Sequence, residues 1–172
     1  MTTFLALIAF GGVLLLLLKV YGFEKVWERT NGPADLGLVV FETLKKGPKP
    51  NQALICPQNM CSAEDRDSVS PRYALSADAM KKAFIKSLEG ETHLHRVDDD
   101  SDPMQIRYVQ HTPLLRFPDT ISVRFIPLDE NRSTIALYAR AQVGYSDMGN
   151  NLKRLNRWLS RLTSFETSYE TS

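Results

Sequence analysis

An uninterrupted apolar run near the N-terminus constrains this chain more than any other feature of its sequence. Residues 4–18 carry no charged side chain and include five consecutive leucines. If Lys19 extends its ammonium group towards water, the run continues to residue 23 and reaches about 20 residues, roughly the helix length that crosses the hydrocarbon core of a bilayer. Tyr21, Phe23 and Trp27 then lie where aromatic side chains favour the membrane interface.

Two other interpretations of this run fit its flanks less well. A cleaved signal peptide begins with basic residues and ends at a small-residue cleavage site, and the sequence shows neither. A buried core helix would be shorter and would show a polar stripe. We therefore expect residues 1–23 to form a single-pass transmembrane helix that anchors the rest of the chain.

The remainder has the length of one small domain. The chain has 172 residues and a formal net charge of +1, which argues against a dedicated nucleic-acid binder. We expect residues 24–52 to be a juxtamembrane segment and linker, residues 53–163 to be the folded domain, and residues 164–172 to be a polar tail.

Periodic patterns in residues 53–163 predict an α+β domain. Ser76 can cap a helix that runs to about residue 89, with Ala77, Met80, Phe84 and Leu88 at helical spacing. A second helix, from residue 149 or 150 to residue 163, is leucine-rich on one side and basic on the other. Strand patterns occupy residues 92–97, 105–112, 121–128 and 134–143. Because the strands follow one another between the helices, we expect a three- or four-stranded antiparallel sheet flanked by the two helices.

Alternation in the last two strands also predicts their register. A three-residue loop at 130–132 pairs Phe125 with Leu137 and keeps the apolar side chains on one face, whereas a four-residue loop would mix the faces. Arg124 and Arg140 then share the polar face, and Arg107 joins them if its strand is adjacent and in phase. Clustered guanidinium groups bind carboxylate or phosphate well, and the alternative is an ordinary exposed sheet face.

Residues 143–151 form the densest group of special residues. Gly144 and Gly149 permit unusual backbone angles, and the start of the following helix would favour an anion. A plain turn between strand and helix explains most of the segment equally well. The candidate ligand-binding residues from the sheet face and from this segment are Arg107, Arg124, Arg140, Tyr145, Ser146, Asp147 and Asn150.

Cys56 and Cys61 are the only cysteines. Structural zinc needs four ligands, and a redox pair would normally be C-x-x-C in a βαβ context. A local disulfide is the best interpretation if the domain lies outside the cytoplasm, and two unpaired thiols are the alternative.

No residue set in the sequence forms a recognisable catalytic, metal or cofactor motif. Nucleophile-elbow, metalloprotease and phosphate-loop patterns are missing. The acidic residues 98–102 lack the glycine and terminal glutamate of an EF-hand. We therefore assign no catalytic residue, no metal ligand and no cofactor, and we leave an enzymatic role open but do not favour it.

Several motifs resemble one known family. They are V-G-Y-S-D-x-G-x-N at residues 143–151, P-N-Q-A-L leading to C-P-x3-C at residues 50–61, and the segments 112–119 and 133–141. Together they are typical of the bacterial family called domain of unknown function fourteen ninety-nine, which has relatives in plastids. The resemblance covers roughly residues 35–163. It implies a membrane-attached or exported domain without an established activity, although this chain lacks the lipobox cysteine of lipoprotein-like relatives.

The sequence contains conflicting indications of the side of the membrane on which the domain lies. Lysine and arginine residues cluster on the C-terminal side of the apolar run, which by itself favours the cytoplasm. The cysteine pair and the resemblance favour the periplasmic side of the bacterial inner membrane. We expect a membrane-tethered, non-enzymatic accessory domain of the cell envelope that binds a protein partner or the membrane surface, and the alternative is a module for a small anionic ligand or a lipid.

Overall fold

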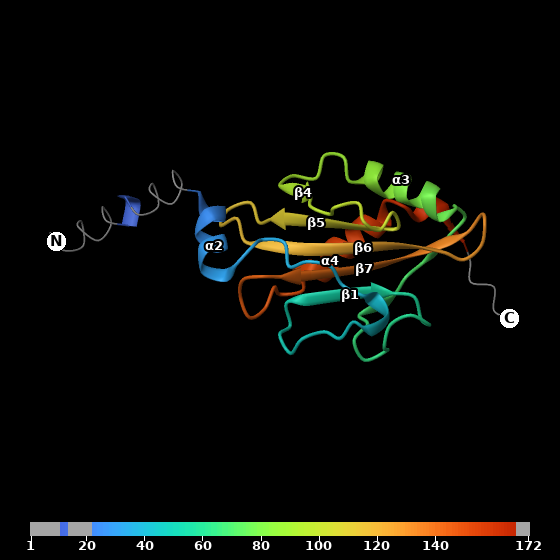
Figure 1. The fold of residues 1–172 in the computed structure, drawn as a ribbon, viewed down its shortest axis with the longest axis horizontal. Helices are drawn as coiled ribbons and strands as arrows, with labels where there is room; N and C mark the ends of the chain where they lie inside the picture. Colours follow the sequence, from blue (N-terminus) through green and yellow to red (C-terminus); the bar gives the residue numbers. More distant parts are fainter. Residues whose placement is uncertain (1–10, 14–21, 168–172) are drawn as a thin grey trace.

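The computed structural model describes residues 11–13 and 22–167 and shows an α+β fold built on one sheet (Figure 1). Its strands are β1 (Gln52–Cys56), β2 (Ser68–Val69), β3 (Arg72–Tyr73), β4 (Leu94–Arg96), β5 (Gln105–His111), β6 (Pro118–Pro127), β7 (Ser133–Ala141) and β8 (Glu166–Thr167). Its helices are α2 (Phe23–Asn31), α3 (Ala77–Ser87) and α4 (Asn150–Ser160), with short 3-10 turns at Phe41–Thr43 and Thr163–Phe165.

The predicted three- or four-stranded antiparallel sheet is wrong. The sheet has eight strands, with the order β2-β1-β7-β6-β5-β4 and with β3 pairing both β7 and β8. It is mixed, because β1 and β2 run parallel. β1 gave no alternating pattern because it lies between two strands and its last four residues are all buried. Strands of two residues are too short to give any pattern.

The predicted transmembrane helix is not part of the described fold either. Most of that prediction falls on residues 1–10 and 14–21, which lie outside the described residues. Within residues 11–13 and 22–167, no helix is both long enough and apolar enough to cross a membrane.

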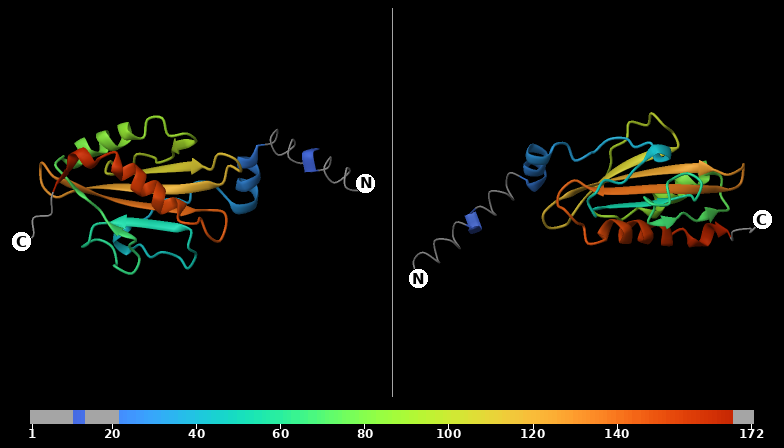
Figure 2. Two further views of the ribbon diagram at one scale, coloured as in Figure 1. Left: turned by 180° about the vertical axis from the view of Figure 1, so that it is seen from behind. Right: turned by 90° about the horizontal axis from the view of Figure 1, so that it is seen from below.

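α3 and α4 cover the same face of the sheet (Figure 2). Phe84 of α3 meets Phe125 of β6 and Trp158 of α4 edge to face, with ring centroids 5.7 and 6.0 Å apart. The four apolar residues predicted at helical spacing are all buried, three of them in α3 and Leu88 directly after it. The predicted cap of α3 is also confirmed, because Ser76 Oγ accepts a hydrogen bond of 3.3 Å from the backbone N–H of Ala79.

The predicted hairpin register between β6 and β7 is wrong by two residues. Phe125 pairs with Ile135 and not with Leu137. The connecting loop is residues 128–132, and Asp129 closes it by accepting a backbone hydrogen bond of 2.9 Å. Side chains alternate along a strand with a period of two, so a slip of two residues leaves each side chain on its predicted face.

Residues 33–44 run across the opposite face of the sheet, and we call this segment the strap. Phe41 is fully buried there against Leu54 of β1 and Ala136 and Tyr138 of β7. The strap falls within residues 24–52, which the sequence led us to treat as a juxtamembrane segment and linker. Both faces of the sheet are therefore covered, one by helices and one by the strap.

Candidate functional site

Arg107, Arg124 and Arg140 share one face of the sheet, as predicted, but the strap covers that face. The guanidinium of Arg107 donates two hydrogen bonds of 2.7 and 2.8 Å to the carboxylate of Asp35. Arg140 donates to the backbone carbonyls of Leu36 at 2.5 Å and Gly37 at 3.2 Å.

Arg124 makes the loosest of these contacts. It lies 3.6 Å from Glu42 of the strap, and both side chains are partly exposed. All three arginines therefore bind oxygen atoms of the chain itself, where the sequence suggested an anionic ligand. The carboxylate of Asp35 accepts the hydrogen bonds of Arg107, and the backbone carbonyls of the strap accept those of Arg140.

Asp35 is held in its ionised form by this arrangement. Burial raises its pKa, but hydrogen bonds from Arg107 and from the backbone N–H of Gly37 outweigh that effect and lower the pKa below its usual value. The carboxylate of Asp35 is therefore ionised at neutral pH and forms an ion pair with the guanidinium of Arg107.

The other predicted ligand residues lie elsewhere, in the turn between β7 and α4. Asp147 lies two residues before Gly149, the N-cap of α4, and its two carboxylate oxygens accept from the backbone N–H groups of Gly149 at 3.0 Å and Asn151 at 2.7 Å. Ser146 Oγ accepts from the backbone N–H of Met148 at 3.1 Å. Tyr145 points into solvent. The structure does not bring these residues together with the three arginines.

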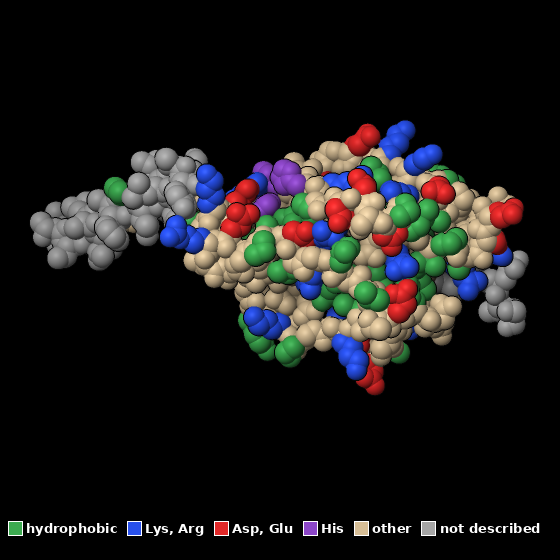
Figure 3. Space-filling model, viewed as in Figure 1, with side chains coloured by type: hydrophobic (Ala, Val, Ile, Leu, Met, Phe, Trp, Pro, Cys, Tyr) green, Lys and Arg blue, Asp and Glu red, His purple; other side chains and the backbone are tan. Residues whose placement is uncertain are grey.

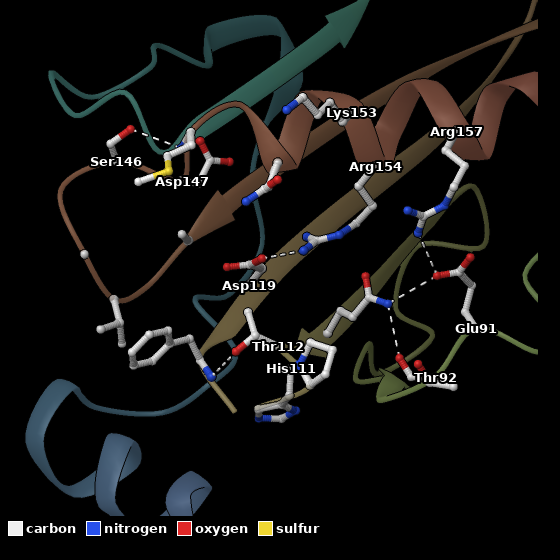
Figure 4. A pocket seen from close by; sticks show the side chains of 18 residues that line it. Glu91, Thr92, His111, Thr112, Asp119, Ser146, Asp147, Lys153, Arg154 and Arg157 are labelled. Atoms are coloured by element: carbon white, nitrogen blue, oxygen red, sulfur yellow. Dashed lines mark hydrogen bonds and ion pairs between the residues drawn. The ribbon is translucent and has the colours of Figure 1, made fainter. Parts of the chain in front are cut away.

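A cleft of about 670 Å³ lies beside this turn, at the end of the sheet where β5 ends and β6 begins (Figure 4). Its walls are the loop of residues 112–117, the turn of residues 143–148, and the first two turns of α4. None of Arg107, Arg124 and Arg140 lines it. Its charged lining residues are Glu91, Asp119, Asp147, Lys153, Arg154 and Arg157.

Asp119 and Arg154 form the ion pair at the floor of the cleft. Arg154 donates to Asp119 at 2.6 Å and to the side-chain oxygen of Asn151 at 2.8 Å. Both charged side chains are largely buried. Burial raises the pKa of Asp119 above its usual value, and the nearby Arg154 offsets only part of that effect.

A second acidic group closes the far side of the cleft. Glu91 accepts from Arg157 at 3.0 Å and also pairs with Arg161, which lies outside the cleft lining. Burial raises the pKa of Glu91, but the hydrogen bonds from Arg161 and Gln110 lower it by more. Lys153 stands apart at the cleft wall, and its ammonium group makes no hydrogen bond or ion pair with the described residues (Figure 4).

His111 lies at the end of β5 and lines the cleft. Burial lowers the pKa of its imidazole, so the neutral form is favoured at pH 7. Its Nδ1 atom is buried and has no hydrogen-bond partner among the described residues. Oε1 of Gln110, the neighbouring lining residue, is likewise buried without a partner among the described residues.

Two buried asparagines connect the cleft to β1. The side chain of Asn51 donates to the carbonyls of Ala141 at 3.2 Å and Gly144 at 3.1 Å. Asn151 donates in turn to the carbonyl of Asn51 at 3.2 Å. These bonds fix the turn that begins at Gly144, where the backbone has a positive φ of 97° that favours glycine.

Sequence reasoning did not identify Asp119, Arg154, Asn51 and Asn151 as a connected group. Each lies in a segment that contributed to the family resemblance or to the basic side of the last helix, but the partners are far apart in the chain. Nothing in the local pattern marks such pairs, because their contact depends on the order of the strands. Among the described residues, no three His, Cys, Asp or Glu side chains come close enough to hold a metal ion.

The two cysteines are joined. Cys56 and Cys61 form a disulfide beneath the strap, with their Cα atoms 6.1 Å apart. Both residues are buried beside Phe41. Of the two alternatives that the sequence left open, the structure has the disulfide.

The fold and the cleft define a small α+β domain with a polar cleft at one end of a covered sheet. The chain belongs to the family described as "Protein of unknown function (DUF1499)", whose model matches residues 48–162. This match confirms the family resemblance. No curated protein matches the chain.

Proposed function

We propose that this chain is a non-enzymatic accessory domain of the cell envelope, held at a membrane by its apolar N-terminal segment, that binds a protein partner through the cleft. The observation that carries the proposal is the position of the cleft. Three of the segments that resemble the family meet around it: residues 50–61 reach it through Asn51, and residues 112–119 and 143–151 line it.

Binding suits the cleft better than catalysis does. Asp119 is paired with Arg154, Glu91 is paired with two arginines, and both oxygens of Asp147 accept from the backbone. Carboxylates held in this way are poor general bases, because proton transfer needs a group that can approach the reacting atom. A fixed pattern of donors and acceptors is instead well suited to recognising a partner.

The disulfide supports a location outside the cytoplasm. Structural disulfides persist in oxidising compartments and are rare where thioredoxin and glutathione keep thiols reduced. We propose that the domain lies on the periplasmic side of the inner membrane, and the cytoplasmic face is the alternative. Alkaline phosphatase fused after Ser172 tests this: we expect an active fusion, and an inactive one would contradict the location.

Site-specific photocrosslinking in intact cells tests the partner. A photoreactive residue replaces Lys153, which is exposed and lines the cleft, and the matched control replaces Asn156, which is exposed on α4 outside the cleft. We expect a discrete protein adduct from position 153 and none from position 156. The absence of any protein adduct at 153, or the same adducts at both positions, would overturn the proposal.

A small anionic ligand is the second candidate, and Lys153 is the observation that favours it. Its ammonium group stands at the cleft wall beside Arg157, which is half exposed. Native mass spectrometry of the wild-type protein and of Lys153→Ala, with inorganic phosphate as the probe, separates the two candidates. Phosphate retained by the wild type but not by the variant would favour this second function, and identical spectra would remove it.

A further inference from the structure

Two loops at the α2 end of the molecule expose large apolar side chains. Leu114 is 81% exposed in the loop of residues 112–117, and Tyr145 and Met148 are 71% and 85% exposed in the turn of residues 143–148. Leu115 is a fourth, at 38%. Both loops contribute residues to the same cleft, and Met148 is one of its lining residues. Single exposed apolar residues are common, but a group of them beside polar residues is typical of a surface that binds a protein, a ligand or a membrane.

α2 is fixed between these two loops. The indole N–H of Trp27 donates to the carbonyl of Leu115 at 2.6 Å, and its ring packs against Phe117 with centroids 4.8 Å apart. On the other side, Gln142 donates to the carbonyls of Asn31 at 3.1 Å and Pro33 at 2.6 Å. The middle and the C-terminal end of α2 are therefore both tied to the end of the sheet where the two loops lie (Figure 1).

The length of chain before α2 indicates what covers this surface. The first turn of α2 is joined to the loop of residues 112–117 by the ion pair of Glu24 with Arg116. From residue 18, the end of the apolar run, to residue 23 the chain can span at most about 17 Å when fully extended. The loops must therefore lie close to whatever surface holds residues 4–18.

Exposed basic side chains lie at this end of the molecule, and acidic side chains lie between them. Lys25 and Arg29 are exposed on α2, where Glu24 and Glu28 alternate with them, and Lys153 is exposed at the cleft. Figure 3 shows lysine and arginine side chains at α2, at one end of the folded part, with acidic and histidine side chains close to them. Basic residues beside exposed apolar and aromatic side chains are the composition of interfacial membrane contacts.

We propose that this end of the domain docks on a bilayer that contains anionic lipids, with Leu114, Leu115, Tyr145 and Met148 in the interface and the mouth of the cleft facing the headgroups. This inference rests on the proposed membrane association and adds an orientation to it. It also means that a ligand or partner segment reaches the cleft along the membrane surface.

Fluorescence of the full-length protein in vesicles tests the docking. Because the two native cysteines are bonded to each other, Met148→Cys and Leu114→Cys each add one free thiol for an environment-sensitive dye. The control is Leu128→Cys, which is 43% exposed in the loop at the opposite end of β6 and β7. The vesicles contain phosphatidylcholine with phosphatidylglycerol, and a second set carries spin-labelled lipids that quench a dye in the interface.

We expect a blue shift and lipid quenching at positions 148 and 114, and neither at position 128. In vesicles of phosphatidylcholine alone, we expect a smaller shift at 148. If the protein floats with vesicles but the dyes at 148 and 114 remain in water, the docking is wrong while the membrane association stands. If the three positions respond alike, there is no preferred face and the docking is also wrong. If the protein does not float at all, both proposals fail.

Discussion

The ion pair between Arg107 and Asp35 holds the strap on the sheet, and we expect its loss to destabilise the protein far more than the loss of the other strap ion pair. The Arg107 side chain is 8% exposed and that of Asp35 is 28% exposed, and two hydrogen bonds of 2.7 and 2.8 Å join them. The Arg124 side chain is 31% exposed, that of Glu42 is 48% exposed, and 3.6 Å separates them. The two pairs lie on one strap and differ in burial and geometry.

The expected losses in the free energy of unfolding follow from this difference in burial and geometry. Removing one partner of a buried ion pair costs about 3–5 kcal/mol, and the partial exposure of Asp35 reduces our expectation for Asp35→Ala to about 2–3 kcal/mol. Glu42→Ala removes an exposed pair and should cost about 0–1 kcal/mol. For a chain of this size, the first change corresponds to a melting temperature lowered by roughly 5–10 °C.

Urea denaturation followed by circular dichroism measures both changes. A double-mutant cycle with Asp35→Ala, Arg107→Ala and the double variant isolates the pair itself, because the lost packing of each side chain cancels. We expect a coupling free energy of about 1.5–3 kcal/mol for this pair and less than about 0.5 kcal/mol for the cycle of Glu42 with Arg124. Equal coupling in the two cycles would refute the assignment of the strap's stability to the buried pair.

Three further outcomes are expected. Asp147→Ala removes two side-chain hydrogen bonds to backbone N–H groups at the start of α4 and should lower the free energy of unfolding by about 1–2 kcal/mol, measured by thermal denaturation, and an unchanged transition would contradict this stabilising role. Replacing Cys56 and Cys61 by alanine opens a short loop and should lower it by roughly 2 kcal/mol, and a reducing agent should lower the stability of the wild type but leave that of the variant unchanged. Burial raises the pKa of Asp98, but hydrogen bonds from Arg96 lower it to about 2. The stability that the Asp98 charge contributes is therefore present above its ordinary pKa of 3.8 and is lost as the pH falls from about 4 to 2. Acid titration of the wild type and Asp98→Asn should therefore diverge above pH 4 and converge near pH 2, and parallel curves would be contrary to this reasoning.

The elements with a strong periodic pattern were predictable from the sequence. α3 begins after its serine cap, α4 begins at Asn150, and β5 begins at Gln105, each as expected to within a residue or two. The sheet as a whole was not predictable. β1 is buried along nearly its whole length, and its apolar residues give no signal that separates a central strand from a short apolar turn.

For the three arginines, the sequence predicted the face of the sheet on which they lie but not the segment that covers this face. Alternation placed Arg107, Arg124 and Arg140 on one face even though the register was wrong, because alternation determines the face and only the loop determines the pairing. The pattern could not show that the strap covers this face. Asp35 lies 72 residues before Arg107, and no local feature connects them.

Alkaline carbonate extraction of membranes that contain the full-length chain tests the central claim most directly. We expect the protein to remain in the membrane pellet after the wash, because an anchor made by the apolar residues 4–18 would not depend on charge. Recovery of the protein in the supernatant would contradict the membrane association, and with it the docking of the cleft on a lipid surface.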